Sequence, residues 1–133
     1  MSGRLLDANH FGLAVRAGSP ILARIKSELG RGLKVGTCIP VLCEIEVGAC
    51  NVTDPLEYHR GIQRALRHVR LWPLTETTAR FYGEIANDLR RRGRALSQVD
   101  IMLGALCREL DLTLVTTDKD FEALTWLKTE NWT

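Results

Sequence analysis

The chain has 133 residues, 45% of them hydrophobic and 26% charged, with a formal net charge of +2. This length and composition suit one globular domain over residues 1–133 with a real core. The charge is too small to indicate a nucleic-acid partner by itself. The sequence has no apolar run of about 18 residues and no charged-then-apolar leader, so we expect no membrane span, no signal peptide and a cytoplasmic location.

Strand-like apolar runs alternate with helical patterns along the chain. Strands are expected, in chain order, over residues 4–7, 33–39, 71–74, 112–116 and 126–129. Helices are expected over residues 11–16, 20–30, 40–50, 56–69, 76–92 and 97–110, and residues 118–124 suit a loop or a short helix. Ser19 and Thr75 suit helix N-caps, and Gly93 suits the position after a helix. Gly48 is expected to permit a close approach between elements.

This alternation of strands and helices predicts the α/β fold class, because parallel strands need helical crossovers that cover the sheet. The expected architecture is a three-layer α/β/α sandwich with a short-stranded, mainly parallel central sheet. The sequence shows no internal repeat and no second domain.

The chain contains four cysteines, Cys38, Cys43, Cys50 and Cys107. No spacing gives a CxxC pair, and each cysteine has apolar neighbours in sequence. We therefore expect small buried hydrophobic residues in a reducing compartment, in preference to a metal site or disulfides.

Four acids lie at comparable places in the predicted elements. Asp7 ends the first strand, Asp118 follows the strand over residues 112–116, and Glu44 and Asp100 lie in the first or second turns of helices. In open α/β sheets the site lies outside the carboxyl ends of the strands. An all-oxygen set is typical of Mg²⁺ or Mn²⁺, and without a cation these carboxylates would repel one another. Taken singly, each acid also suits a turn or the positive end of a helix.

Several segments, in their order and spacing, resemble a PIN domain, specifically a VapC-type toxin of a type II toxin–antitoxin pair, over essentially the whole chain. They are LLDANH, VLCEIEVGA, RRRGRALSQVDIMLGAL and LTLVTTDKDFEAL followed by LKTENW. The resemblance implies a Mg²⁺- or Mn²⁺-dependent endoribonuclease, an antitoxin partner and a homodimer. It also implies that the acidic site residues are Asp7, Glu44, Asp100 and Asp118, with Asp120 as an additional acid that assists or substitutes for Asp118.

Two positions depart from the family pattern. The family usually has Thr or Ser where this chain has Ala8, and often has a further acid where it has Gln98. A catalytically silent PIN-like binding module is therefore the alternative to the nuclease. A phospho-acceptor receiver domain is a weaker alternative, because residues 71–74 offer no Asp and Glu44 and Asp100 would be unexplained.

A candidate RNA-binding surface lies on the helix over residues 56–69. Arg60, Arg64 and Arg67 recur at helical spacing, and we call them the arginine stripe. Such a stripe can hold a phosphate backbone with little sequence information, although a solvated surface would look the same. A second basic block follows at residues 90–94. Asn9 and its neighbour His10 lie beside Asp7, where they either contact RNA or cap a turn, and the turn is slightly favoured.

Overall fold

The computed structural model describes residues 3–133, so the first two residues of the predicted domain lie outside the described residues. Its centre is a five-stranded sheet in the order β3-β2-β1-β4-β5, in which every neighbouring pair is parallel. The strands are β1 (Gly3–Leu6), β2 (Val35–Cys38), β3 (Arg70–Trp72), β4 (Leu112–Val115) and β5 (Thr129–Glu130). The predicted parallel sheet is confirmed.

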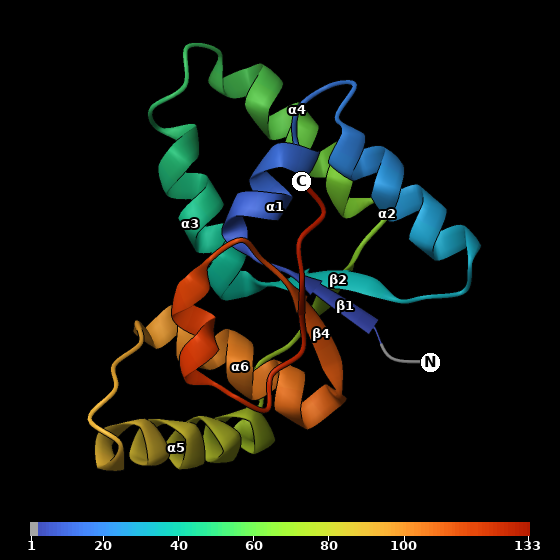
Figure 1. Ribbon diagram of the computed structural model, residues 1–133. Coiled ribbons are helices and arrows are strands. Elements are labelled where there is room, and N and C mark those ends of the chain that lie inside the picture. Colours follow the sequence, from blue (N-terminus) through green and yellow to red (C-terminus); the bar gives the residue numbers. More distant parts are fainter. Residues whose placement is uncertain (1–2) are drawn as a thin grey trace.

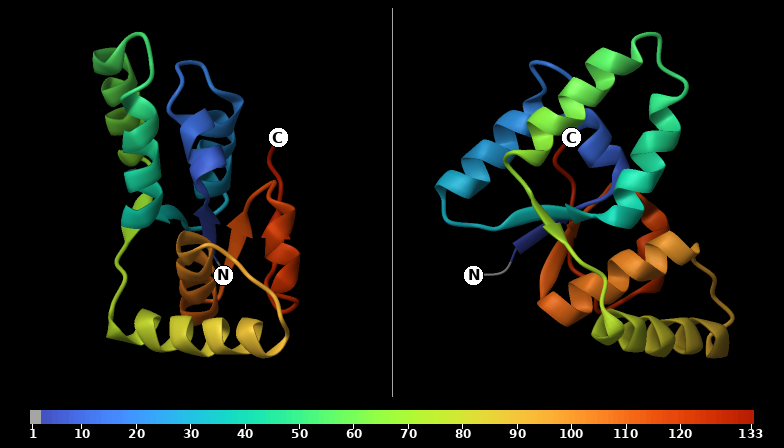
Figure 2. Two further views of the ribbon diagram at one scale, coloured as in Figure 1. Left: turned by 90° about the vertical axis from the view of Figure 1, so that its left-hand side faces the viewer. Right: turned by 180° about the vertical axis from the view of Figure 1, so that it is seen from behind.

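Helices cover both faces of this sheet. They are α1 (Ala8–Ala14), α2 (Pro20–Gly30), α3 (Ile39–Ala49), α4 (Pro55–Leu66), α5 (Glu76–Arg91), α6 (Gln98–Leu110) and the 3₁₀ helix η1 (Lys119–Ala123). Figures 1 and 2 show α1 to α4 on one face of the sheet and α5 and α6 on the other, which confirms the three-layer α/β/α sandwich. Within residues 3–133, no helix is both long and apolar enough to cross a membrane.

Local signals set the helix ends. Ser19 Oγ accepts a hydrogen bond from the backbone N–H of Ile21 at 3.1 Å, and the backbone N–H of Thr75 donates to Thr78 Oγ1 at 3.0 Å. Gly93 follows α5 with a φ of 65°, a left-handed conformation that glycine adopts at no steric cost. The expected caps at these three helix ends are therefore present.

The core is one continuous cluster of buried side chains to which every helix contributes. Strands β2 and β4 are buried at every residue. This is the pattern of parallel strands covered on both faces, and it explains why their sequences show no alternation of apolar and charged residues, with only Thr37 and Thr113 as polar members.

The last strand differs from its prediction. An apolar run suggests a strand over residues 126–129, but β5 is Thr129–Glu130. Trp126 lies in a turn before it and is 36% exposed, with the Arg108 guanidinium 4.9 Å from the centre of its ring. The hydrophobic side chains of this run pack in a turn, while the strand itself is polar and forms the sheet edge beside β4.

The close helix contact occurs at Gly61 and not at Gly48. A Cβ added at Gly48 would meet only the Tyr58 hydroxyl, at 3.7 Å, whereas one at Gly61 would overlap the carbonyl oxygen of Val15. Gly61 therefore lets α4 pack directly on the end of α1. The residue that the sequence suggested for close approach lies instead on an exposed part of α3.

The prediction for the four cysteines is wrong in part. Cys38 and Cys107 are buried as predicted, and burial raises the pKa of the Cys38 thiol to about 11, but Cys43 and Cys50 are exposed on and beside α3.

The strand order β3-β2-β1-β4-β5 differs from the 2-1-3-4-5 order of receiver domains, which removes that alternative.

Candidate metal centre

The site lies where the strand order reverses direction, between β1 and β4. The chain leaves β1 toward β2 on one side and reaches β4 on the other, so the carboxyl ends of these two strands flank the crevice that open α/β sheets use for ligands. Figure 1 shows the beginnings of α1, α3 and α6 and the segment before η1 converging at this edge of the sheet. These are the segments that carry the predicted acids.

Three aspartates form the centre of this edge, and we call them the aspartate cluster. Asp100, Asp118 and Asp120 each offer one carboxylate oxygen, and these oxygens all lie within 4.8 Å of one another. Asp100 comes from the first turn of α6, while Asp118 and Asp120 come from the loop after β4 and the start of η1. Two separate elements thus converge on a space of the size that one cation occupies.

Short-range hydrogen bonds fix the backbone that presents the aspartate cluster. Asp118 caps η1, because its Oδ1 accepts from the backbone N–H of Asp120 at 2.8 Å. The backbone N–H of Asp118 donates to Thr116 Oγ1 at 3.0 Å, and that of Asp100 donates to the Ser97 hydroxyl at 3.1 Å. The carboxylates are therefore held close together by local geometry.

The carboxylate of Asp100 lies in an environment that disfavours its charge. Burial raises the pKa of this carboxyl above its usual range, and the charges of Asp118, Glu44 and Asp120 raise it further, against a lowering hydrogen bond from Ser97. An uncompensated group of carboxylates is unfavourable for the folded protein, and a divalent cation removes the conflict. The donor chemistry and the charge of the aspartate cluster therefore fit a hard divalent cation such as Mg²⁺ or Mn²⁺.

The other two predicted acids lie at the same edge but outside the aspartate cluster. Asp7 is the N-cap of α1 and is 7% exposed, and its backbone N–H donates to the Val115 carbonyl at 3.2 Å, beside the end of β4. Glu44 is exposed on α3, and its charge acts on Asp100. The structure thus brings one carboxylate oxygen each of Asp100, Asp118 and Asp120 within 4.8 Å of one another. Asp7 and Glu44 lie at the same edge of the sheet but outside this cluster.

The structure places Asn9 and His10, both near Asp7 in the sequence, in different environments. His10 is fully buried, which is incompatible with a contact to substrate, and its backbone N–H donates to the Asp7 carboxylate that caps α1. Asn9 is exposed, and its Nδ2 donates to Thr117 Oγ1 at 3.3 Å, next to Asp118. Asn9 therefore links the beginning of α1 to the loop that carries the aspartate cluster.

The arginine stripe lines a hollow of about 380 Å³ along α4, together with Leu56, His59 and Gln63. Its members are not equivalent. The Arg64 guanidinium donates to the Val15 carbonyl at 3.1 Å, so this side chain fastens α4 to α1. Arg60 approaches Glu57 at 3.8 Å in an exposed pair, and Arg67 is exposed at the end of α4.

Arg92, in the second basic block, has a role that the sequence did not indicate. Its Nη2 donates to the Ala123 carbonyl at 2.8 Å, and its Nε donates to Asp88 Oδ2 at 2.9 Å. This residue therefore fastens the end of η1, whose start holds part of the aspartate cluster, to the end of α5. A run of arginines gives no signal that one of them is committed in this way.

The chain matches the PIN domain family over residues 4–127 and belongs to that family. Its fold is similar to a chain of VapBC2 from Rickettsia felis bound to a promoter DNA fragment, at a TM-score of 0.86 and 19% identity over 98% of both chains. It is also similar to VapBC-1 from nontypeable Haemophilus influenzae, at a TM-score of 0.81 and 23% identity over 97% of both chains. A third similar structure is VapBC-5 from Mycobacterium tuberculosis, a member of the VapBC family of toxin–antitoxin systems, at a TM-score of 0.69 and 18% identity over 98% of both chains. No curated protein sequence matches the chain closely enough to assign a relative.

Proposed function

We propose that the protein is a Mg²⁺- or Mn²⁺-dependent endoribonuclease that acts as the toxin of a toxin–antitoxin pair. The observation that carries the proposal is the aspartate cluster at the strand-order reversal of a PIN domain. Membership of the family and the likeness to VapBC structures support the toxin role. The exposed position of Asp118 and Asp120 suits a substrate that approaches from outside.

The residues divide the chemistry among them. A cation held here would activate a water and screen the charge that develops on the phosphate. Asp100, Asp118 and Asp120 would hold the cation, and Asp7 would complete its coordination from the end of β1. Glu44, which is exposed on α3, would accept the proton of the attacking water.

Metal binding is expected to stabilise the folded protein. Because a cation binds the aspartate cluster only when it is assembled, adding Mn²⁺ at 100 times its Kd should raise the free energy of unfolding by about 2.7 kcal/mol. The Asp7→Asn, Asp100→Asn double variant should lose this gain. Thermal melting with and without Mn²⁺ measures both, and an equal rise of Tm in the two proteins would contradict the metal site.

RNA is proposed to lie along the exposed members of the arginine stripe. The Arg60→Gln, Arg67→Gln double variant should bind RNA more weakly and show a slope of log Kd against log salt reduced by about 1.4, because two fewer counterions are released from a single strand. Arg64→Gln is the informative comparison, since Arg64 donates to Val15 and its loss should lower Tm instead. An unchanged slope in the double variant would identify the stripe as a solvated surface.

We further propose an antitoxin partner, a homodimer and a cytoplasmic location, which are the setting of a toxin that cleaves cellular RNA. The likeness to VapBC-5, which belongs to a family of toxin–antitoxin systems, supports the partner. The competing proposal is a catalytically silent PIN-like module, to which Ala8 and Gln98 point. Cleavage of RNA by the purified protein, dependent on Mg²⁺ or Mn²⁺ and abolished by chelator, separates the two.

A further inference from the structure

His10 makes three hydrogen bonds although it is completely buried. The backbone N–H of Trp132 lies 3.2 Å from His10 Nε2. A backbone N–H can only donate, so Nε2 must offer its lone pair, and the ring proton is on Nδ1. This contact therefore selects the neutral Nδ1–H tautomer and excludes the doubly protonated ring.

The tautomer determines whether the His10 ring donates a hydrogen bond to the Asp7 carboxylate. His10 Nδ1–H points to Asp7 Oδ1 at 3.2 Å, and the backbone N–H of His10 donates to the same oxygen at 2.8 Å. No described residue donates to the other oxygen, Oδ2. The carboxylate is thus held through one oxygen, and the second oxygen has its lone pairs free for a cation.

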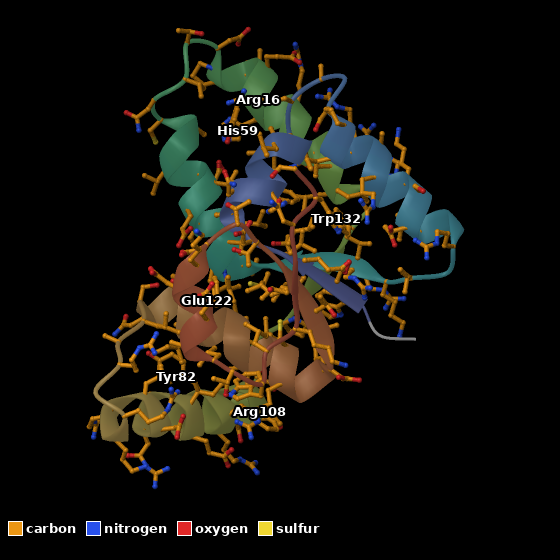
Figure 3. The ribbon with its side chains drawn as sticks, viewed as in Figure 1. Arg16, His59, Tyr82, Arg108, Glu122 and Trp132 are labelled. Carbon is orange, nitrogen blue, oxygen red and sulfur yellow. The ribbon has the colours of Figure 1, made fainter. Side chains whose placement is uncertain are left out.

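The donor that selects the tautomer is itself well anchored. The Trp132 side chain is 9% exposed, and the Arg24 guanidinium of α2 lies 4.9 Å from the centre of its ring. Figure 3 shows Trp132 in the C-terminal segment, on the side of the sheet where α1 and α2 lie. The segment therefore presents its backbone N–H to His10 from a fixed position.

We propose that His10 is a positioning residue that fixes the carboxylate of Asp7 for metal binding, and that the C-terminal segment, through the backbone N–H of Trp132, fixes His10. The inference rests on the proposed metal site. It assigns the C-terminal segment a part in that site, although this segment contributes no acid to it. Groups that orient metal ligands in this way typically change metal affinity by large factors when they are removed.

Two substitutions test the hydrogen bonds of the two ring nitrogens of His10 separately. In His10→Asn the amide occupies the place of Nδ1 and can still donate to Asp7, but nothing accepts from Trp132. In His10→Gln the longer amide reaches the place of Nε2 and can accept from Trp132, but Asp7 loses its side-chain donor. Both variants lose similar packing, so their metal-free Tm values should fall together.

The measurement is the Kd for Mn²⁺, from the EPR signal of free Mn²⁺, with the metal-free Tm recorded beside it. We expect His10→Gln to raise the Kd about tenfold and His10→Asn to stay within about threefold of the wild type. His68→Gln, at a partly exposed histidine just after α4, is the control and should leave the Kd unchanged. Equal Kd values for His10→Gln and the wild type would overturn the proposal, because a merely structural histidine affects only Tm.

Nitrogen NMR of the wild type tests the same proposal without any substitution of His10. The ¹⁵N pattern of the ring should be that of the Nδ1–H tautomer, and its Nδ1 signal should shift during a Mg²⁺ titration with the midpoint of binding. An Nε2–H tautomer, or a His10 signal that stays fixed while Asp118 and Asp120 amides saturate, would overturn the inference alone. Failure of the wild type to bind Mn²⁺ or Mg²⁺ would overturn the proposed function and the inference with it.

Discussion

The rate of metal-dependent RNA cleavage is expected to fall at least about a hundredfold in the Asp100→Asn variant. Removal of a group that only supports a metal ligand can already lower activity by about that factor, and Asp100 is a proposed ligand itself. The amide keeps the size of the side chain and leaves the hydrogen bond between the Asp100 backbone and Ser97 intact. It removes the negative charge that α6 contributes to the aspartate cluster. Cleavage assays with Mg²⁺ on the variant and the wild type measure the loss.

The same substitution should make the metal-free protein slightly more stable at neutral pH. The pKa of Asp100 is raised in the folded state, so its ionised form disfavours folding, and the stability of the wild type falls as pH rises through that pKa. The asparagine side chain of the variant cannot ionise, and Tm should rise by up to about 3 °C at pH 7. Below the ordinary pKa of an aspartate both proteins carry a neutral group, and the difference should vanish.

Melting curves without metal between pH 3 and pH 8, taken on the preparation used for the cleavage assay, test this second effect. Glu84→Gln is the matched control, because it removes one exposed carboxylate from α5, a helix that carries no member of the aspartate cluster. We expect it to change neither cleavage nor the pH dependence. An active Asp100→Asn protein with a slightly lower Tm would instead identify Asp100 as an ordinary helix-end acid, worth about 0.3–1 kcal/mol.

Gly61→Ala should be the most destabilising single-methyl change in the described part of the chain. The added Cβ would overlap the Val15 carbonyl oxygen and come within 2.8 Å of Val15 Cγ1. Neither atom belongs to a flexible side-chain end, and Arg64 donates to the same carbonyl, so α4 must shift from α1 and lose that hydrogen bond. We expect a loss of about 3 kcal/mol in the free energy of unfolding, or a fall in Tm of about 10 °C.

The control for this change is Gly83→Ala on α5. A Cβ at Gly83 would meet nothing within 4 Å, so the intrinsic helix preference of alanine should dominate and stabilise the protein by about 0.5–1 kcal/mol. Urea unfolding should show a lower free energy of unfolding for Gly61→Ala and a higher one for Gly83→Ala. Similar effects from both substitutions would show that α4 does not approach α1 as closely as the structure indicates.

The fold was predictable because its signals are local. Ser19, Ser97 and Gly93 mark helix ends through contacts within a few residues, and strands β2 and β4, which carry no charged residue, are buried at every position. The errors come from tertiary contacts. β5 takes its place from hydrogen bonds with β4, such as Leu114 N–H to the Lys128 carbonyl at 2.9 Å, and its own residues are polar.

For the candidate site, the sequence predicts which acids approach one edge of the sheet but not the distances between them. The strand ends and the helix first turns indicate which acids approach one edge, but distances within the aspartate cluster depend on the 3₁₀ turn that follows Asp118. The link from Asp7 through His10 to Trp132 joins residues from opposite ends of the chain. No sequence period or local motif reports such a contact.

The position of β1 has a consequence for how the protein is made. The first strand of the chain lies in the middle of the sheet, and its pairing on one side is with β4, where Gly3 lies opposite Leu112. A ribosome therefore releases β1 long before its partner exists, and the edge that carries Asp7 and Asp118 cannot form until almost the whole chain has emerged. The proposed nuclease would therefore be inert during its own translation, because its metal site would assemble only once β4 and the loop after it have emerged.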